Sequence, residues 1–182
     1  MDEVKPQKEE KIMVECQKCL DPTSLGLFLV AVVSLPLAIL QLMEPDGLSA
    51  LPTQQFFVLL GLLIIVVAML AYRSDSNFGF VVFALVGAAI TMTGLGMGPY
   101  ENITFAIIFI LAAIWSIFAK TPKNLTFILI ASTLIFLFVG LSNPEVIGGD
   151  YWHWLIGFAA LINFILSIFL AYALATEKLP VY

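Results

Sequence analysis

Six stretches of this sequence are each close to the length of a membrane-spanning helix and contain no Asp, Glu, Lys or Arg. A helix needs about 20 mainly apolar residues to cross a hydrocarbon core of about 30 Å. In lipid it must also satisfy its own backbone hydrogen bonds. We therefore predict an all-α integral membrane protein with six transmembrane helices paired in three hairpins. The predicted spans are residues 25–43, 56–72, 78–98, 103–119, 125–142 and 152–174.

The charges outside these spans predict the orientation of the chain. The eight basic residues fall on one side of the predicted bundle: Lys5, Lys8, Lys11, Lys18, Arg73, Lys120, Lys123 and Lys178. The loops on the other side carry acids only: Glu44, Asp46, Glu101, Glu145 and Asp150. Because basic residues concentrate in cytoplasmic loops, we predict a multi-pass protein of the plasma membrane with both termini cytoplasmic. The net charge of −5 indicates no nucleic-acid partner.

The predicted organisation is a cytoplasmic tail at 1–20, a six-helix pore domain at 21–176 and a second cytoplasmic tail at 177–182. The first tail mixes acids with lysines, so it is not expected to be a signal peptide. Its Cys16 and Cys19 form a lone C-x-x-C pair, which offers only two of the four ligands of a structural zinc site. Incidental reduced thiols, a redox or metal role shared between subunits, and lipidation all remain open for this pair.

The first, third and fifth spans begin in similar ways, with DPTSL at 21–25, DSNFG at 75–79 and PKNLTF at 122–127. Small polar side chains of these types cap helix N-termini, so we expect capped helix starts at the cytoplasmic mouth. The similarity fits either a threefold internal repeat or ordinary capping. Gly94 and Gly98 form a small-xxx-small pair that favours close helix packing. Pro36 is expected to bend the first span.

The sequence lacks the side chains that an enzyme site would need. His153 is the single histidine, and it lies among interfacial aromatic residues. It is expected to be either part of the aromatic belt at the membrane interface or a pH-sensitive gate. The spans contain no ionisable relay, which most pumps require. We therefore expect no catalysis, metal or cofactor. Asn163 is expected either to bond a neighbouring helix or to line a path for a small uncharged molecule or monocarboxylate.

Several motifs, taken in order, resemble the acetate uptake transporter family of the succinate–acetate permease type. The family begins its first helix with Asn-Pro-Ala-Pro-Leu-Gly-Leu, which is similar to DPTSLGL at 21–27. Its third helix begins with Asn-Thr-Phe-Gly, which resembles SNFG at 76–79, followed here by Phe83 and Gly87. The sixth span contributes WLIG at 154–157. The likeness covers about residues 21–180.

The resemblance implies a homohexamer in membrane lipid, with one pore per subunit for acetate and, in some members, succinate. The family's pore constriction falls at Val30, Val86 and Ser132 in this sequence, and a shift of register brings Phe28 or Phe83 there instead. The candidate path residues are Val30, Val86, Ser132, Thr133, Phe83 and Asn163. The candidate residues of the cytoplasmic mouth are Asp21, Pro22, Thr23, Ser24, Leu25, Gly26, Asn77, Phe78, Gly79 and Asn124.

The predicted function is thus a channel or proton-linked permease for small monocarboxylates. Because the spans carry no relay group, either the substrate brings its own proton or the anion moves passively. Two alternatives stay open. One is a pore for neutral solutes such as urea, amides or ammonia, and the other is a membrane scaffold without transport activity.

Overall fold

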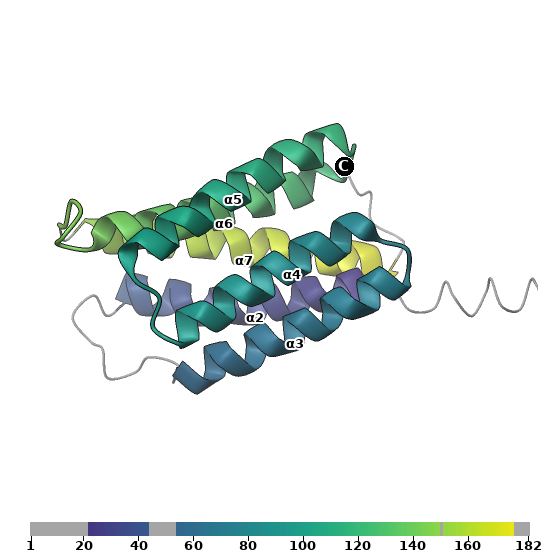
Figure 1. Ribbon diagram of the computed structural model, residues 1–182, viewed down its shortest axis with the longest axis horizontal. Helices are drawn as coiled ribbons and strands as arrows, with labels where there is room; N and C mark the ends of the chain where they lie inside the picture. Colours follow the sequence, from purple (N-terminus) through teal and green to yellow (C-terminus); the bar gives the residue numbers. More distant parts are fainter. Residues whose placement is uncertain (1–21, 44–53, 150, 177–182) are drawn as a thin grey trace, which may run out of the picture.

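The computed structural model describes residues 22–43, 54–149 and 151–176, and this part of the chain forms six α-helices (Figure 1). Each helix is long and apolar enough to cross a membrane, so the predicted all-helical architecture with six helices of membrane-spanning length is confirmed for the described residues. Cys16, Cys19, Asp21 and both predicted tails lie outside the described residues. The helices are α2 (Pro22–Met43), α3 (Gln54–Arg73), α4 (Asn77–Gly94), α5 (Pro99–Phe118), α6 (Lys123–Ser142) and α7 (Trp152–Thr176).

The third span is shorter than predicted. We expected it to reach residue 98, but α4 ends at Gly94. The backbone N–H of Leu95 donates to the carbonyls of Thr91 and Met92, both at 3.1 Å. Gly96 then takes a φ of +91°, a left-handed conformation in which glycine commonly terminates a helix.

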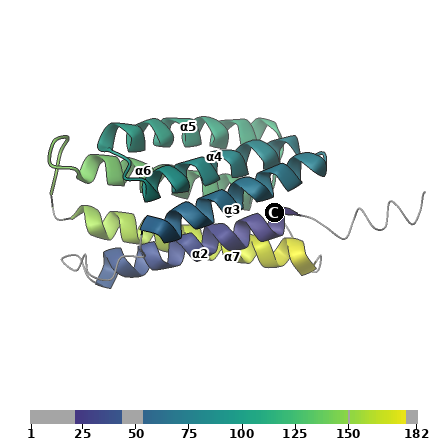
Figure 2. The ribbon, with the colours of Figure 1, turned by 60° about the horizontal axis from the view of Figure 1, so that its bottom comes forward.

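The helices form a ring in chain order, which α7 closes by returning beside α2. The closest packing joins α3 to α4, α5 to α6 and α2 to α7, whereas α4 and α5 scarcely touch. Figure 2 shows α2 and α7 running side by side along the bottom of the bundle. The predicted division into three hairpins is therefore wrong for α4 and α5.

Glycines explain why α3 and α4 pack so closely. A Cβ on Gly61 would lie 2.7 Å from the carbonyl oxygen of Gly87, and one on Gly87 would lie 2.8 Å from that of Gly61. Further along, a Cβ on Gly94 would lie 2.7 Å from the carbonyl oxygen of Gln54. The small residues of α4 that pack against α3 are therefore Gly87 and Gly94. The predicted pair of Gly94 and Gly98 is wrong, because Gly98 lies outside α4 as the N-cap of α5.

The three similar helix starts are not capped in the same way. Ser76 caps α4, and its Oγ accepts a hydrogen bond from the N–H of Gly79 at 3.3 Å. The N-cap of α6 is Pro122, which has no side-chain capping bond. At the start of α2, Ser24 donates to the carbonyl of Ala171 on α7 at 2.9 Å. The prediction that a side chain caps each of these helix starts is thus wrong for α6.

The charged side chains of the described residues lie at the two ends of the bundle. Arg73, Lys120 and Lys123 lie at the end where α2 begins and α7 ends, which we call the basic end. Glu101 and Glu145 lie at the opposite end, which we call the acidic end. Asp75 also lies at the basic end, so the described basic residues gather at one end and the opposite end carries acids only, as predicted. Which end faces the cytoplasm stays a prediction.

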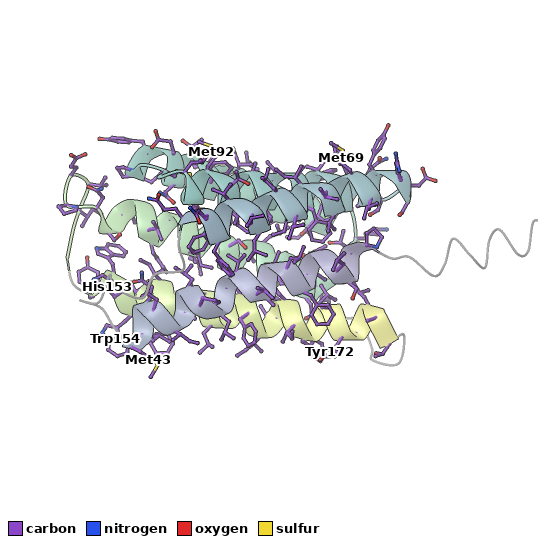
Figure 3. All side chains as sticks on the ribbon, turned by 90° about the horizontal axis from the view of Figure 1, so that it is seen from below. Met43, Met69, Met92, His153, Trp154 and Tyr172 are labelled. Carbon is purple, nitrogen blue, oxygen red and sulfur yellow. The ribbon has the colours of Figure 1, made fainter. Side chains whose placement is uncertain are left out.

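Large apolar side chains cover the outside of the ring. Met69 and Met92 lie on one side of the bundle in Figure 3, and Trp154 and Tyr172 lie on the other. Each of the four is 42% exposed or more. Because lipid solvates apolar side chains as well as a protein core does, this surface fits a hydrocarbon environment.

Candidate functional site

The ring encloses a cavity of about 380 Å³, and all six helices contribute to its wall. The wall extends from the middle of the bundle, at Val30 and Asn163, to the acidic end, at Gln54. Gln54 is also exposed at the start of α3, so the cavity reaches the surface of the protein there. Its volume is near the lower limit of ligand pockets, which hold about 300–1,000 Å³.

The cavity wall is mainly apolar and its polar groups are neutral. Among the described residues that line it, none carries a formal charge. The wall therefore offers hydrogen bonds but no ion-pair partner for an anion. The polar wall residues are Ser34, Gln41, Gln54, Thr93, Asn102, Ser132 and Asn163.

Three of these side chains form the floor of the cavity near the middle of the bundle. The Nδ2 of Asn163 on α7 donates to the Oγ of Ser34 on α2 at 3.2 Å and to the Oγ of Ser132 on α6 at 3.4 Å. Ser34 in turn donates to the carbonyl of Val30 at 2.9 Å. These bonds link three helices, and all three floor side chains are buried.

The basic half of the bundle is closed by apolar packing. Leu27, Ile64 and Leu129 are at most 1% exposed there. Phe83 on α4 packs its ring directly on Gly26 of α2, where a Cβ would lie 2.6 Å from the ring Cζ. Glycine at position 26 therefore makes room for the ring, and this contact closes the bundle below the floor.

We expect Phe83→Ala to make the closed half leaky, because the ring fills the space above Gly26. The variant should also lose about 3–5 kcal/mol of stability, as buried Phe-to-Ala changes commonly do. The measurements are the passive leak of a small solute from proteoliposomes and the unfolding temperature. Phe118→Ala is the control, because Phe118 is 79% exposed. An unchanged leak in folded Phe83→Ala protein would contradict a sealing role.

The acidic end of the cavity is ordered by a bond between two helices. The Nδ1 of His153 on α7 lies 2.9 Å from the Oε1 of Gln41 on α2. Because an amide oxygen only accepts hydrogen bonds, Nδ1 is the protonated ring nitrogen in this contact. His153 thus orients a wall residue of the cavity, and Figure 3 places it at the end of the bundle beside Met43 and Trp154.

The structure brings four of the six candidate path residues to the cavity. Val30, Val86, Ser132 and Asn163 all line it. Phe83 lies in the closed half, and Thr133 donates to the carbonyl of Leu129 at 2.9 Å. Neither of these two side chains lines the cavity.

The described mouth residues lie at the basic end and line no part of the cavity. Pro22 and Thr23 are in the first turn of α2, and Leu25 points outward with 51% exposure. Asn77 is exposed at the start of α4, and Asn124 is half-buried in the first turn of α6.

The ring of Phe78 packs against Trp115 with centroids 5.0 Å apart, and Gly79 bonds to the cap residue Ser76. Phe78 and Gly79 thus take part in the packing and helix capping of the basic end.

Sequence reasoning missed the polar residues at the acidic end of the cavity. Gln54 and Asn102 line it, yet both lie just outside the predicted spans 56–72 and 103–119. Ser34 and Gln41 lie inside a predicted span, but nothing in the sequence distinguished their inward direction. The available signal was a set of neutral polar residues at similar depths on several helices.

The cavity presents neutral hydrogen-bond donors and acceptors in a mainly apolar wall, which suits a small polar molecule. In the part of the chain that the structure describes, no three His, Cys, Asp or Glu side chains lie together as metal ligands would. No protein-family model, curated protein or solved structure matches this chain. The resemblance to acetate uptake transporters thus stays a prediction.

Proposed function

We propose that this protein is a channel or proton-linked permease for small monocarboxylates, chiefly acetate, with one pore in each subunit. The observation that carries the proposal is the cavity of about 380 Å³ that all six helices enclose. A helix bundle that only needed to be stable would be expected to fill this volume, because protein interiors are close-packed. An open interior that reaches the acidic end supports passage of a solute.

The size of the cavity favours small substrates. At roughly 30 Å³ per molecule in the liquid, it holds about a dozen waters. A carboxylic acid with two carbon atoms fits this space together with several waters. The closed basic half separates the cavity from the other side of the bundle, so transport requires the contact of Phe83 with Gly26 to open.

The neutral wall limits the mechanism. An anion without a cation partner is costly to bring into an apolar site, and the six described helices carry Asp, Glu, Lys or Arg only in their first or last turns. Coupling to protons would therefore come from the proton that the substrate carries. A neutral polar wall suits an uncharged amide or urea equally well, so neutral solutes are the second candidate.

The test is solute flux into proteoliposomes of the purified full chain. Acetic acid crosses lipid unaided, so uptake should be followed by stopped flow and the rate of empty liposomes subtracted. The proposal expects protein-dependent acetate flux that exceeds urea flux. Urea flux without acetate flux would replace the first candidate with the second, and no flux of either by folded protein would favour a scaffold.

The homohexamer, the plasma-membrane location and the cytoplasmic position of the basic end also belong to this proposal. They rest on the family resemblance and on the distribution of charge. Cross-linking in native membranes and protease protection of tagged termini would test them separately.

A further inference from the structure

Asn163 leaves one strong hydrogen-bond acceptor unused at the floor of the cavity. Its side chain is 4% exposed, yet its Oδ1 has no hydrogen-bond partner among the described residues. The other buried side-chain atom in this condition is the Oγ of Ser167 further along α7, which does not line the cavity. Buried polar atoms are nearly always paired, so the unpaired Oδ1 of a residue that lines the cavity indicates a missing polar partner.

The bonding of Ser34 fixes which way the Asn163 amide points. A hydroxyl has one proton to donate, and Ser34 gives it to the carbonyl of Val30 at 2.9 Å. Ser34 can then only accept from Asn163, so the amide group that faces it must be the Nδ2. The free acceptor Oδ1 is therefore a consequence of the network.

Ser132 supplies a donor beside this acceptor. Its Oγ accepts from the Nδ2 of Asn163 at 3.4 Å, and no hydrogen bond from its own proton is formed with the described residues. The floor thus places one unused donor, the Ser132 hydroxyl, next to one unused acceptor, the Asn163 Oδ1. Such a pair complements a ligand that carries an acceptor and a donor side by side.

We infer that Asn163 and Ser132 form a two-point binding site for an undissociated carboxylic acid or a primary amide, and that it disfavours the carboxylate anion. The acid O–H donates to the Oδ1 of Asn163 while its carbonyl accepts from Ser132. A carboxylate has only acceptors, so one of its oxygens would face the Oδ1 lone pairs without a proton between them. This inference rests on the proposed function and names the form of the substrate that is bound.

The experiment measures ligand binding to the full chain in lipid nanodiscs by titration calorimetry, between about pH 5.5 and about pH 7.5. Over this range the undissociated fraction of a carboxylic acid falls about tenfold per pH unit. The apparent dissociation constant of acetate should rise by the same factor, and that of acetamide should stay constant. Acetate affinity that does not change with pH, or no acetamide binding, would overturn the inference.

Variants distinguish this site from binding elsewhere in the cavity. Asn163→Leu should raise the dissociation constants of both ligands about tenfold or more, which is the effect of losing one buried hydrogen bond. Because Asn163 also joins three helices, Ser132→Ala provides a milder test that keeps the bond from Asn163 to Ser34. The Ser132→Ala protein should remain folded and bind both ligands more weakly. Asn143→Leu is the control, since Asn143 bonds the loop N–H of Glu145 outside the cavity.

The outcomes also separate this inference from the proposed function. Protein that binds acetamide and the acid with the expected pH dependence, but passes neither in the flux assay, contradicts the transport proposal and supports the site. Protein that passes acetate while its acetate affinity is independent of pH supports transport and overturns the site.

Discussion

Val86→Phe is expected to reduce protein-dependent acetate flux by about tenfold or more, which corresponds to about 1.4 kcal/mol of added barrier. Val86 lines the cavity and is 7% exposed. At 1.5 Å per residue it lies about 14 Å from the start of α4, close to the depth of Val30 and Ser132 on their own helices. A phenyl ring at this level would fill the inner part of the cavity, through which any solute must pass.

The matched control for this change is Val66→Phe. Val66 is 55% exposed on the outside of α3, so the same substitution there should leave the flux at the wild-type rate. Both proteins should elute as folded species in size-exclusion chromatography. Undiminished acetate flux through folded Val86→Phe protein would show that solute does not pass through this cavity.

Gly87→Val is expected to destabilise the protein strongly by forcing α3 and α4 apart. A Cβ at this position would lie 2.8 Å from the carbonyl oxygen of Gly61 and 2.9 Å from the backbone N–H nitrogen of Ile65. Backbone atoms cannot rotate away as a side chain can, so α3 and α4 would have to separate along their closest contact. We expect a loss of about 3 kcal/mol, at the upper end of overpacking effects.

Thermal unfolding in detergent, followed by circular dichroism, would measure this loss. Ala88→Val is the control, because Ala88 is the next residue on the same helix and is only partly buried. It should unfold close to the wild-type temperature. A Gly87→Val protein as stable as the control would mean that the two helices do not depend on their close approach.

The spanning segments were predictable from the sequence because charge is so costly in lipid. Each block without charged residues became a helix, and the described basic side chains all lie at one end of the bundle. The end of α4 was missed because Gly96 takes a left-handed φ inside a run that is apolar throughout. Apolar composition alone does not reveal such a turn.

The interior of the ring was harder to predict than its span boundaries. Faces that meet lipid and faces that meet protein are equally apolar, so the sequence did not show that Ser34 and Asn163 converge. It named Phe83 as a path residue, but it did not show that the ring packs on Gly26 in the closed half. Close packing of glycine against an aromatic ring depends on helix rotation, which the sequence pattern leaves open.

The most direct test of the central claim is acetate flux before and after modification of Thr93→Cys with a charged thiol reagent. Thr93 lines the cavity and is exposed near its acidic end, so a bulky charge there should block the path. Cys16→Ser and Cys19→Ser remove the native thiols, and Ser74→Cys at the exposed basic end is the control. We expect flux to be lost on modifying position 93 and retained on modifying position 74. Full modification at position 93 with unchanged flux would contradict passage through the cavity.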